Sequence, residues 1–139
     1  MSRKRENVRQ CKAIRQLIDD NKYTKALELI DAIPLEEVGS LDDLYRYAEL
    51  YEKAERMDKK KEIFYHIYHR THSRYMLNRL LRLTIRMGDM EEARELYFAY
   101  EVAGPITLDT FELRYLLAKA EGEPPERLIQ ILEELKKEE

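Results

Sequence analysis

One spacing constrains the fold of this chain more than any other feature. Taking Asn21, Glu55, Gly88 and Gly122 as equivalent turn positions gives separations of 34, 33 and 34 residues. Between these turns, apolar residues recur at helical spacing. A period of this length is typical of stacked helical hairpins, because a single hairpin cannot bury its apolar face alone.

The turn signals predict about eight helices of about 11 to 16 residues each, paired as antiparallel hairpins. The predicted caps are Ser40 or Asp42, Ser73, Asp89, and Thr107 or Asp109, with Pro124 and Pro125 in the first turn of the last helix. We expect one all-α helical-repeat domain over residues 1–139, with four repeats at about 7–40, 41–73, 74–107 and 108–137.

Composition narrows the protein class. With 38% charged residues, four Gly and four Pro, the chain is poorly suited to a β-rich or loop-rich fold. A formal net charge of -3 disfavours non-specific coating of nucleic acid. Cys11 is the only cysteine, and no apolar run is long enough for a secretory signal or a membrane span. We therefore expect a cytoplasmic protein, with no cofactor and no membrane partner.

The third repeat resembles the tetratricopeptide repeat. Its sequence is RYMLNRLLRLTIRMGDMEEARELYFAYEVAGP. The family pattern has a turn Gly, a small residue, an aromatic residue and a Pro, which here are Gly88, Ala93, Tyr97 and Pro105. Lys60 and Arg127 occupy the small-residue position of the second and fourth repeats and depart from the pattern. The resemblance covers the whole chain and implies a right-handed α-solenoid that acts as a protein–protein interaction scaffold.

The resemblance also implies a binding face. In such solenoids the first helix of each hairpin lines a concave groove, and the matching positions here include Tyr45, Tyr75, Asn78, Arg82 and Arg86. Residues 63–88 contain five arginines and no acidic residue, so this segment carries +5 and the remainder -8. Arg82 and Arg86 beside Asn78 resemble the clamp with which some family members hold a peptide's carboxylate. We expect a peptide or helix of another protein as partner, with acidic peptides among the candidates.

A second interpretation of the arginine stripe stays open. The same positions in the second repeat include Glu49 and Glu52. Pairing of Glu49 with Arg82 and of Glu52 with Arg86 would make the stripe an internal ladder of ion pairs, each contributing roughly 0 to 1 kcal/mol.

Several conspicuous residues have structural interpretations. Tyr47, Tyr51 and Tyr97 are expected to pack between helices with their hydroxyls reaching water. Paired carboxylates such as Asp42 and Asp43 are expected to be solvated at helix starts, and Cys11 to be a packed thiol. With no phosphate-binding loop and no nucleophile in a recognisable setting, we expect no enzymatic activity.

The stretch YHIYHRTHSRY invites a metal-site or nucleic-acid interpretation. His66 and His69 are three residues apart, whereas helical zinc sites more often use a spacing of four. We interpret this stretch as an exposed helix face. An RNA-binding helical repeat is the alternative function, although the acidic net charge disfavours a nucleic-acid partner.

The last helix has a wide apolar face formed by Leu128, Ile129, Ile131, Leu132 and Leu135. Solenoids usually finish with a polar capping helix. A second alternative function is therefore a dimerisation or regulatory module of a larger protein, with a homo-oligomer formed through this helix.

Overall fold

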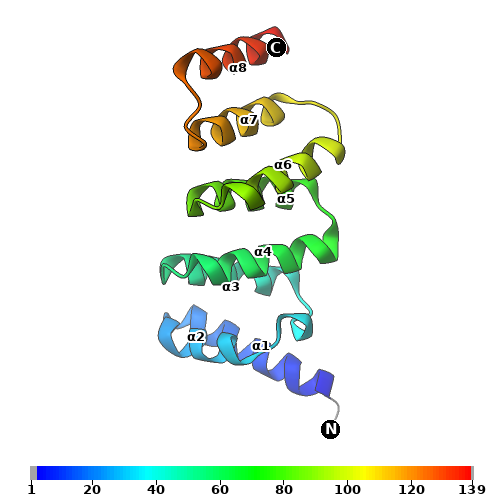
Figure 1. Cartoon of the computed structure of the whole chain (residues 1–139). Coiled ribbons are helices and arrows are strands. Elements are labelled where there is room, and N and C mark those ends of the chain that lie inside the picture. The colour runs from blue at the N-terminus through cyan, green and yellow to red at the C-terminus, as the bar shows by residue number, and fades with distance from the viewer. Residues whose placement is uncertain (1–2, 139) are drawn as a thin grey trace. The chain divides into compact units, whose positions relative to one another are not determined.

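The computed structural model is all-α (Figure 1). It describes the backbone of residues 3–138 and the side chains of residues 5–134, 136 and 137. The helices are α1 (Arg3–Asp19), α2 (Tyr23–Ala32), α3 (Leu41–Lys53), α4 (Met57–Thr71), α5 (Arg74–Met87), α6 (Met90–Val102), α7 (Leu108–Ala120) and α8 (Pro125–Glu138), with a short 3-10 turn η1 (Leu35–Glu37). None of the described helices is long and apolar enough to cross a membrane.

The chain divides into two compact units, Met1–Thr71 and His72–Glu139. In the first unit, α1 pairs with α2 and α3 with α4, while α2 packs on α3. In the second unit, α5 pairs with α6 and α7 with α8, while α7 packs on both α5 and α6 (Figure 1). Each unit thus holds two of the four predicted hairpins, and the right-handed stacking of all four stays a prediction.

The four turns that defined the repeat share one backbone geometry. Asn21, Glu55, Gly88 and Gly122 all adopt the left-handed conformation, with φ of 59°, 60°, 82° and 79°. Each donates its N–H to the carbonyl three residues earlier, and the next residue donates to the carbonyl five residues earlier. This is the Schellman closure of a helix C-terminus. The sequence period therefore corresponds to a repeated physical structure.

The helix starts agree with the predicted caps. The hydroxyls of Ser40 and Ser73 accept the N–H of Asp43 and Met76 at 3.4 and 3.3 Å, and Asp89 accepts that of Glu92 at 3.3 Å. Thr107 forms a capping box with Thr110, and α8 begins at Pro125. Side-chain caps of this kind satisfy backbone donors that the helix leaves unpaired.

The core of each unit consists of apolar side chains at helical spacing. In the first unit, Ile14, Leu44, Phe64 and Ile67 are at most 2% exposed. The second unit buries a corresponding set to the same degree: Leu77, Leu80, Leu81, Leu113 and Ile131. The predicted packed environment of Cys11 is confirmed, because the cysteine is buried. The side chain of Leu135, predicted to belong to the apolar face of the last helix, lies outside the described residues.

Two predictions about polar groups in the first unit were wrong. The hydroxyls of Tyr47 and Tyr51 do not reach water: the Tyr47 side chain is completely buried beside Cys11, and the Tyr51 hydroxyl donates to the Asp31 carboxylate. Asp43 is also not solvated, because it lies on the inner side of the first turn of α3 and pairs with Arg15 at 3.1 Å.

The small-residue position of the repeat is an alanine in the first and third hairpins and a basic residue, Lys60 or Arg127, in the second and fourth. Ala26 and Ala93 are fully buried and let the paired helices approach closely. Lys60 takes this position in the second hairpin and is also buried, with its ammonium 3.0 Å from Glu52 and 5.3 Å from the centre of the Phe64 ring. The carboxylate and the ring compensate the loss of water around the buried charge.

Candidate functional site

The predicted binding residues fall on two helices. Tyr45 is half-buried on α3 in the first unit, whereas Tyr75, Asn78, Arg82 and Arg86 lie on α5 in the second. The opposite face of α5 is fixed in the core through Met76, Leu77, Leu80, Leu81, Leu83 and Thr84. Because a helix exposes the side opposite its buried stripe, α5 presents its binding candidates together. The placement of Tyr45 beside them stays a prediction.

Asn78 and Arg82 form a positioned pair. The Arg82 Nε donates to the Asn78 Oδ1 at 2.8 Å, one helical turn away. The Arg82 Nη2 also lies 3.6 Å from the Glu112 Oε2 on α7. These two partners restrict the orientation of the guanidinium, while its side chain keeps 38% of its surface exposed. Arg82 is thus held in place and still accessible to an acceptor.

Tyr75 and Arg86 flank this pair along α5. Tyr75, in the first turn, is 64% exposed and has the Arg79 guanidinium 5.8 Å from its ring centre. Arg86 is exposed in the last turn. A cation there interacts favourably with the carbonyl end of the helix dipole. The α5 face therefore combines an aromatic ring at one end with cationic groups at the other.

Two residues of the predicted ion-pair ladder, Arg82 and Glu52, each have an ion-pair partner inside their own unit. Arg82 pairs with Glu112 of the following hairpin, and Glu52 pairs with Lys60 of its own hairpin. The Glu49–Arg82 and Glu52–Arg86 pairs would join the two units, so they stay predictions. The Arg82–Glu112 pair was missed because pattern reasoning compared α5 only with the hairpin before it.

Two arginines of the basic segment bind backbone carbonyls. Arg70 donates to the Val38 carbonyl at 2.8 Å. Arg74 donates twice to the Tyr100 carbonyl, at 3.1 and 2.9 Å, and its guanidinium lies 4.0 Å from the Tyr100 ring centre. A side chain at Gly104 would meet this guanidinium, since an added Cβ would lie 2.8 Å from it. Arg74 therefore fastens the start of the α5–α6 hairpin to its end, and Arg70 fastens the end of α4 to the loop that precedes α3.

The histidines of α4 lie among aromatic and basic groups. The His69 ring stacks on Tyr65 with ring centres 6.2 Å apart, and His66 Nε2 lies 2.7 Å from the Arg70 guanidinium. Burial lowers the pKa of His66, and the neighbouring Arg70 charge adds to this effect. Among the described residues, no three His, Cys, Asp or Glu side chains are grouped as a metal ion would require.

A second polar network joins the two hairpins of the first unit. Asp31 at the end of α2 accepts a hydrogen bond from Tyr51 and lies 3.0 Å from the Arg56 guanidinium. The Tyr51 hydrogen bond, with help from Arg56, outweighs burial and lowers the pKa of Asp31. In turn, burial and the Asp31 contact raise the pKa of Tyr51. The network holds α2 against the turn that follows α3.

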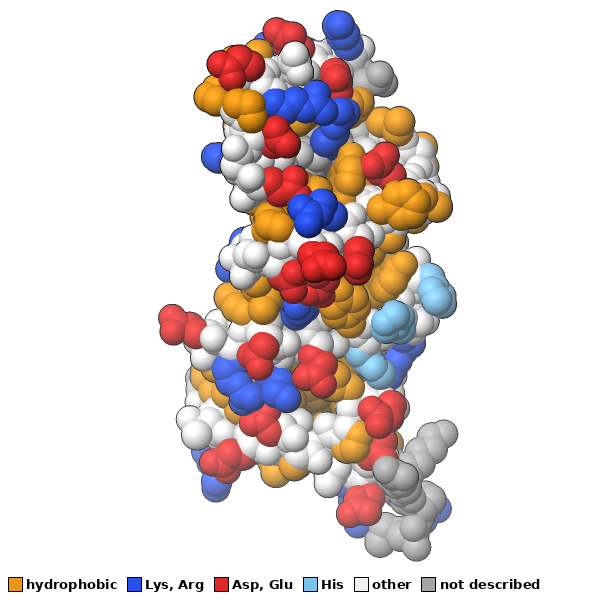
Figure 2. All heavy atoms as spheres, in the orientation of Figure 1, with side chains coloured by type: hydrophobic (Ala, Val, Ile, Leu, Met, Phe, Trp, Pro, Cys, Tyr) orange, Lys and Arg blue, Asp and Glu red, His pale blue; other side chains and the backbone are white. Residues whose placement is uncertain are grey.

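Surface charge is mixed. Figure 2 shows acidic and basic side chains interspersed with apolar ones over the displayed face.

No protein-family model, curated protein or solved structure matches the chain. The hairpins of the chain define an all-α protein built from repeated helical pairs. A functional assignment is therefore argued from the residue contacts within this structure.

Proposed function

We propose that the chain is a non-catalytic, tetratricopeptide-like scaffold that binds a peptide or helix of another protein along the first helices of its hairpins. The observation that carries the proposal is the exposed face of α5, where Asn78 positions Arg82 beside Tyr75 and Arg86. Four hairpins closed by the same turn support the repeat assignment. No catalytic residue is part of the proposal.

The contact with Glu112 indicates how an acceptor would bind. At 3.6 Å, with the Glu112 side chain 56% exposed, this ion pair is a weak one of roughly 0 to 1 kcal/mol. A carboxylate of a partner can therefore replace Glu112 at little cost. The Asn78 contact through Nε leaves the outer edge of the guanidinium for a two-point bond to the incoming group. An acidic side chain or a peptide C-terminus fits this requirement.

The test is a pull-down from native lysate, read by mass spectrometry, with the wild-type chain and the Arg82→Glu/Arg86→Glu variant. Lys12→Glu/Lys25→Glu is the matched control, since it makes the same charge change at exposed positions on α1 and α2. Circular dichroism first establishes equal helicity. Partners lost only with the α5 variant would support the proposal, whereas identical partners for all three proteins would refute a role for the α5 face.

A further inference from the structure

The most exposed large apolar side chains of the described residues lie close together in the second unit. Val102, Phe98 and Ile106 are 70%, 69% and 66% exposed. Phe98 and Val102 are one turn apart on α6, and Ile106 follows in the loop before α7. Figure 2 shows apolar side chains next to acidic ones over the end of α6. Apolar residues that are exposed as a cluster indicate an interaction surface, whereas single ones need no explanation.

A pocket of about 300 Å³ adjoins this apolar cluster. It is formed by the end of α6, the loop that follows, and side chains of α7 and α8. Ile106 belongs to both the cluster and the pocket, where Tyr97 and Phe111 supply aromatic surface. Arg114 and Glu134 also line the pocket and are paired with each other at 2.7 Å. Its volume is at the small end of the range for ligand pockets, so it suits one side chain of a partner protein.

The cluster lies in the middle of the outer face of α6. The inner face is fixed in the core of the unit through Ala93, Leu96 and Tyr100, which are all buried. Successive residues of a helix are rotated by about 100°, so Phe98 points away from these three. The outer face of α6 is therefore available to a partner while the inner face holds the hairpin together.

The outer face continues as a stripe along the whole helix. Glu91, Glu95, Phe98 and Val102 follow one another at spacings of four, three and four residues, and all four are exposed. Residues at these spacings lie one above the other on one side of a helix. A second helix that packs along α6 would contact all four, because packed helices meet along such rows.

The acidic end of the stripe carries charge that the chain leaves uncompensated. Neither Glu91 nor Glu95 forms an ion pair with a described residue. The single basic residue of α6, Arg94, is already bound to Glu121 at 2.8 Å. The stripe thus presents two carboxylates over its first half and two apolar side chains over its second half. Its complement is a helix with two cations followed or preceded by two apolar residues.

We propose that the outer face of α6 binds an amphipathic, positively charged helix of a partner protein. The apolar residues of this helix pack on Phe98 and Val102 beside the pocket, and its lysines or arginines lie against Glu95 and Glu91. The inference goes beyond the proposed function of the α5 face. It places a second binding surface on the other helix of the same hairpin and gives it the opposite charge preference.

The experiment is an amide ¹H–¹⁵N NMR titration of the full chain with blocked, alanine-based helical peptides. Each peptide repeats the spacing of the stripe with two leucines and then two residues X, where X is Lys, Gln or Glu. Aligned antiparallel to α6, the leucines meet Val102 and Phe98 and the X residues meet Glu95 and Glu91. We expect saturable shifts at these residues with the Lys peptide, about five- to tenfold weaker binding of the Gln peptide, and no binding of the Glu peptide.

Apolar variants test the packing part of the proposal. Phe98→Ser/Val102→Ser should weaken binding of the Lys peptide about tenfold or more through lost apolar contact. Both side chains are exposed in the free chain, so their replacement leaves the core intact, which circular dichroism checks. The control Val8→Ser/Leu29→Ser changes two exposed apolar residues of the first unit and should leave the affinity unchanged within about twofold.

Charge variants test the electrostatic part. Glu91→Gln/Glu95→Gln should reduce the affinity for the Lys peptide to that for the Gln peptide, because the two carboxylates account for the difference between them. The control Glu28→Gln/Glu49→Gln removes two exposed charges of the first unit and should change the affinity by less than about twofold.

Equal affinity for the Lys and Gln peptides would overturn the proposal, because the face would then read apolar character alone. Shifts confined to other residues, or no shifts with any peptide, would overturn it as well. Concentration-dependent shifts at Phe98 and Val102 without peptide would identify a second copy of the chain as the occupant and refute a partner helix. Arg82→Glu/Arg86→Glu should leave the Lys-peptide shifts in place, and their loss would refute a binding surface separate from α5.

Discussion

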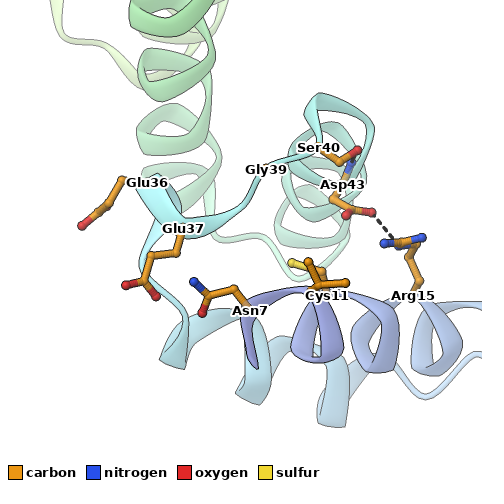
Figure 3. Close-up of a pocket in the computed structure, with 9 residues that line it drawn as sticks. Asn7, Cys11, Arg15, Glu36, Glu37, Gly39, Ser40 and Asp43 are labelled. Atoms are coloured by element: carbon orange, nitrogen blue, oxygen red, sulfur yellow. Dashed lines mark hydrogen bonds and ion pairs between the residues drawn. The ribbon is translucent and has the colours of Figure 1, made fainter. Parts of the chain in front are cut away.

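The two units join their hairpins differently. In the second unit, α5 packs directly on α7, and both helices bury apolar side chains, among them Leu77, Leu81 and Leu113. In the first unit, Cys11 of α1 and Tyr47 of α3 are buried beside each other, and the Arg15–Asp43 and Arg46–Asp19 ion pairs also link the two helices, with an open cavity alongside (Figure 3). Polar links and a cavity contribute less stability than a packed apolar contact. The comparison indicates that the first unit adds ion pairs to the packed contact between its hairpins, whereas the second relies on apolar packing.

The turns also differ between the units. The first unit places Asn21 and Glu55 in the left-handed conformation, where the second has Gly88 and Gly122. At the small-residue position, by contrast, each unit has one alanine, Ala26 or Ala93, and one basic residue, Lys60 or Arg127. Left-handed backbone costs roughly 1 to 2 kcal/mol for a residue with a Cβ. The second unit therefore follows the repeat's local rules more closely than the first.

The largest predicted effect comes from transferring the buried lysine to the second unit. Ala93→Lys should cost about 3 to 5 kcal/mol of unfolding free energy, because the residue equivalent to Glu52 is Ile85 and supplies no charge to the ammonium. Urea denaturation measures the change. Adding Ile85→Glu should recover part of the loss, and a double variant no more stable than Ala93→Lys would contradict the pairing argument.

A smaller loss is expected from breaking the same pair in the first unit. Glu52→Gln leaves the Lys60 ammonium, whose side chain is 7% exposed, without its carboxylate. We expect a loss of about 1 to 2 kcal/mol, since Glu52 itself is partly exposed and water can replace it in part. Thermal and urea denaturation would report it, with Glu49→Gln as an exposed control on the same helix. A loss of similar size in the control would show that helix charge, not the pair, is responsible.

The turns offer a reciprocal test. Gly88→Ala should destabilise the fold by about 1 kcal/mol through backbone strain alone, because an added Cβ meets no atom within 4 Å. Glu55→Gly should stabilise it by about the same amount, since glycine adopts positive φ freely. Both changes are read from denaturant midpoints. Two changes of the same sign would disprove the equivalence of the turns.

The smallest effects concern two acids of the first unit. The folded pKa of Asp31 is lowered, chiefly by Tyr51, so its stabilisation is present above the ordinary pKa and is lost as the pH falls. Burial raises the folded pKa of Asp43, so its contribution is present at low pH and is lost as the pH rises. As the pH falls from 7 to 3, the difference in unfolding free energy between wild type and Asp31→Asn should shrink by about 1 kcal/mol or less. Over the same range, the difference between wild type and Asp43→Asn should grow. Parallel profiles would contradict these assignments.

The sequence was sufficient for features fixed by local chemistry. The period, the four turns and the caps at Ser40, Ser73 and Asp89 each depend on residues within one helix end, so pattern reasoning found them. The Asn78, Arg82 and Arg86 set was correctly predicted to lie on one helix, because helical spacing alone determines that.

Features set by distant contacts could not be predicted in this way. The Arg74 bonds to the Tyr100 carbonyl join residues 26 apart, and the ion pair of Asp43 with Arg15 joins two different helices. The pattern of charges indicated a basic surface over residues 63–88, yet Arg70 and Arg74 are used inside the fold. Composition shows which charges a segment carries but does not show which of them find internal partners.

Native-state hydrogen exchange tests the contrast between the units most directly. We predict that buried amides of the first unit, such as Tyr47 and Phe64, open with a free energy about 1 kcal/mol lower than those of Leu80 and Leu96 in the second. The reason is that the first unit has two left-handed residues that carry a Cβ, Asn21 and Glu55, whereas the second has one, His72. Equal opening free energies, or lower values in the second unit, would contradict the account.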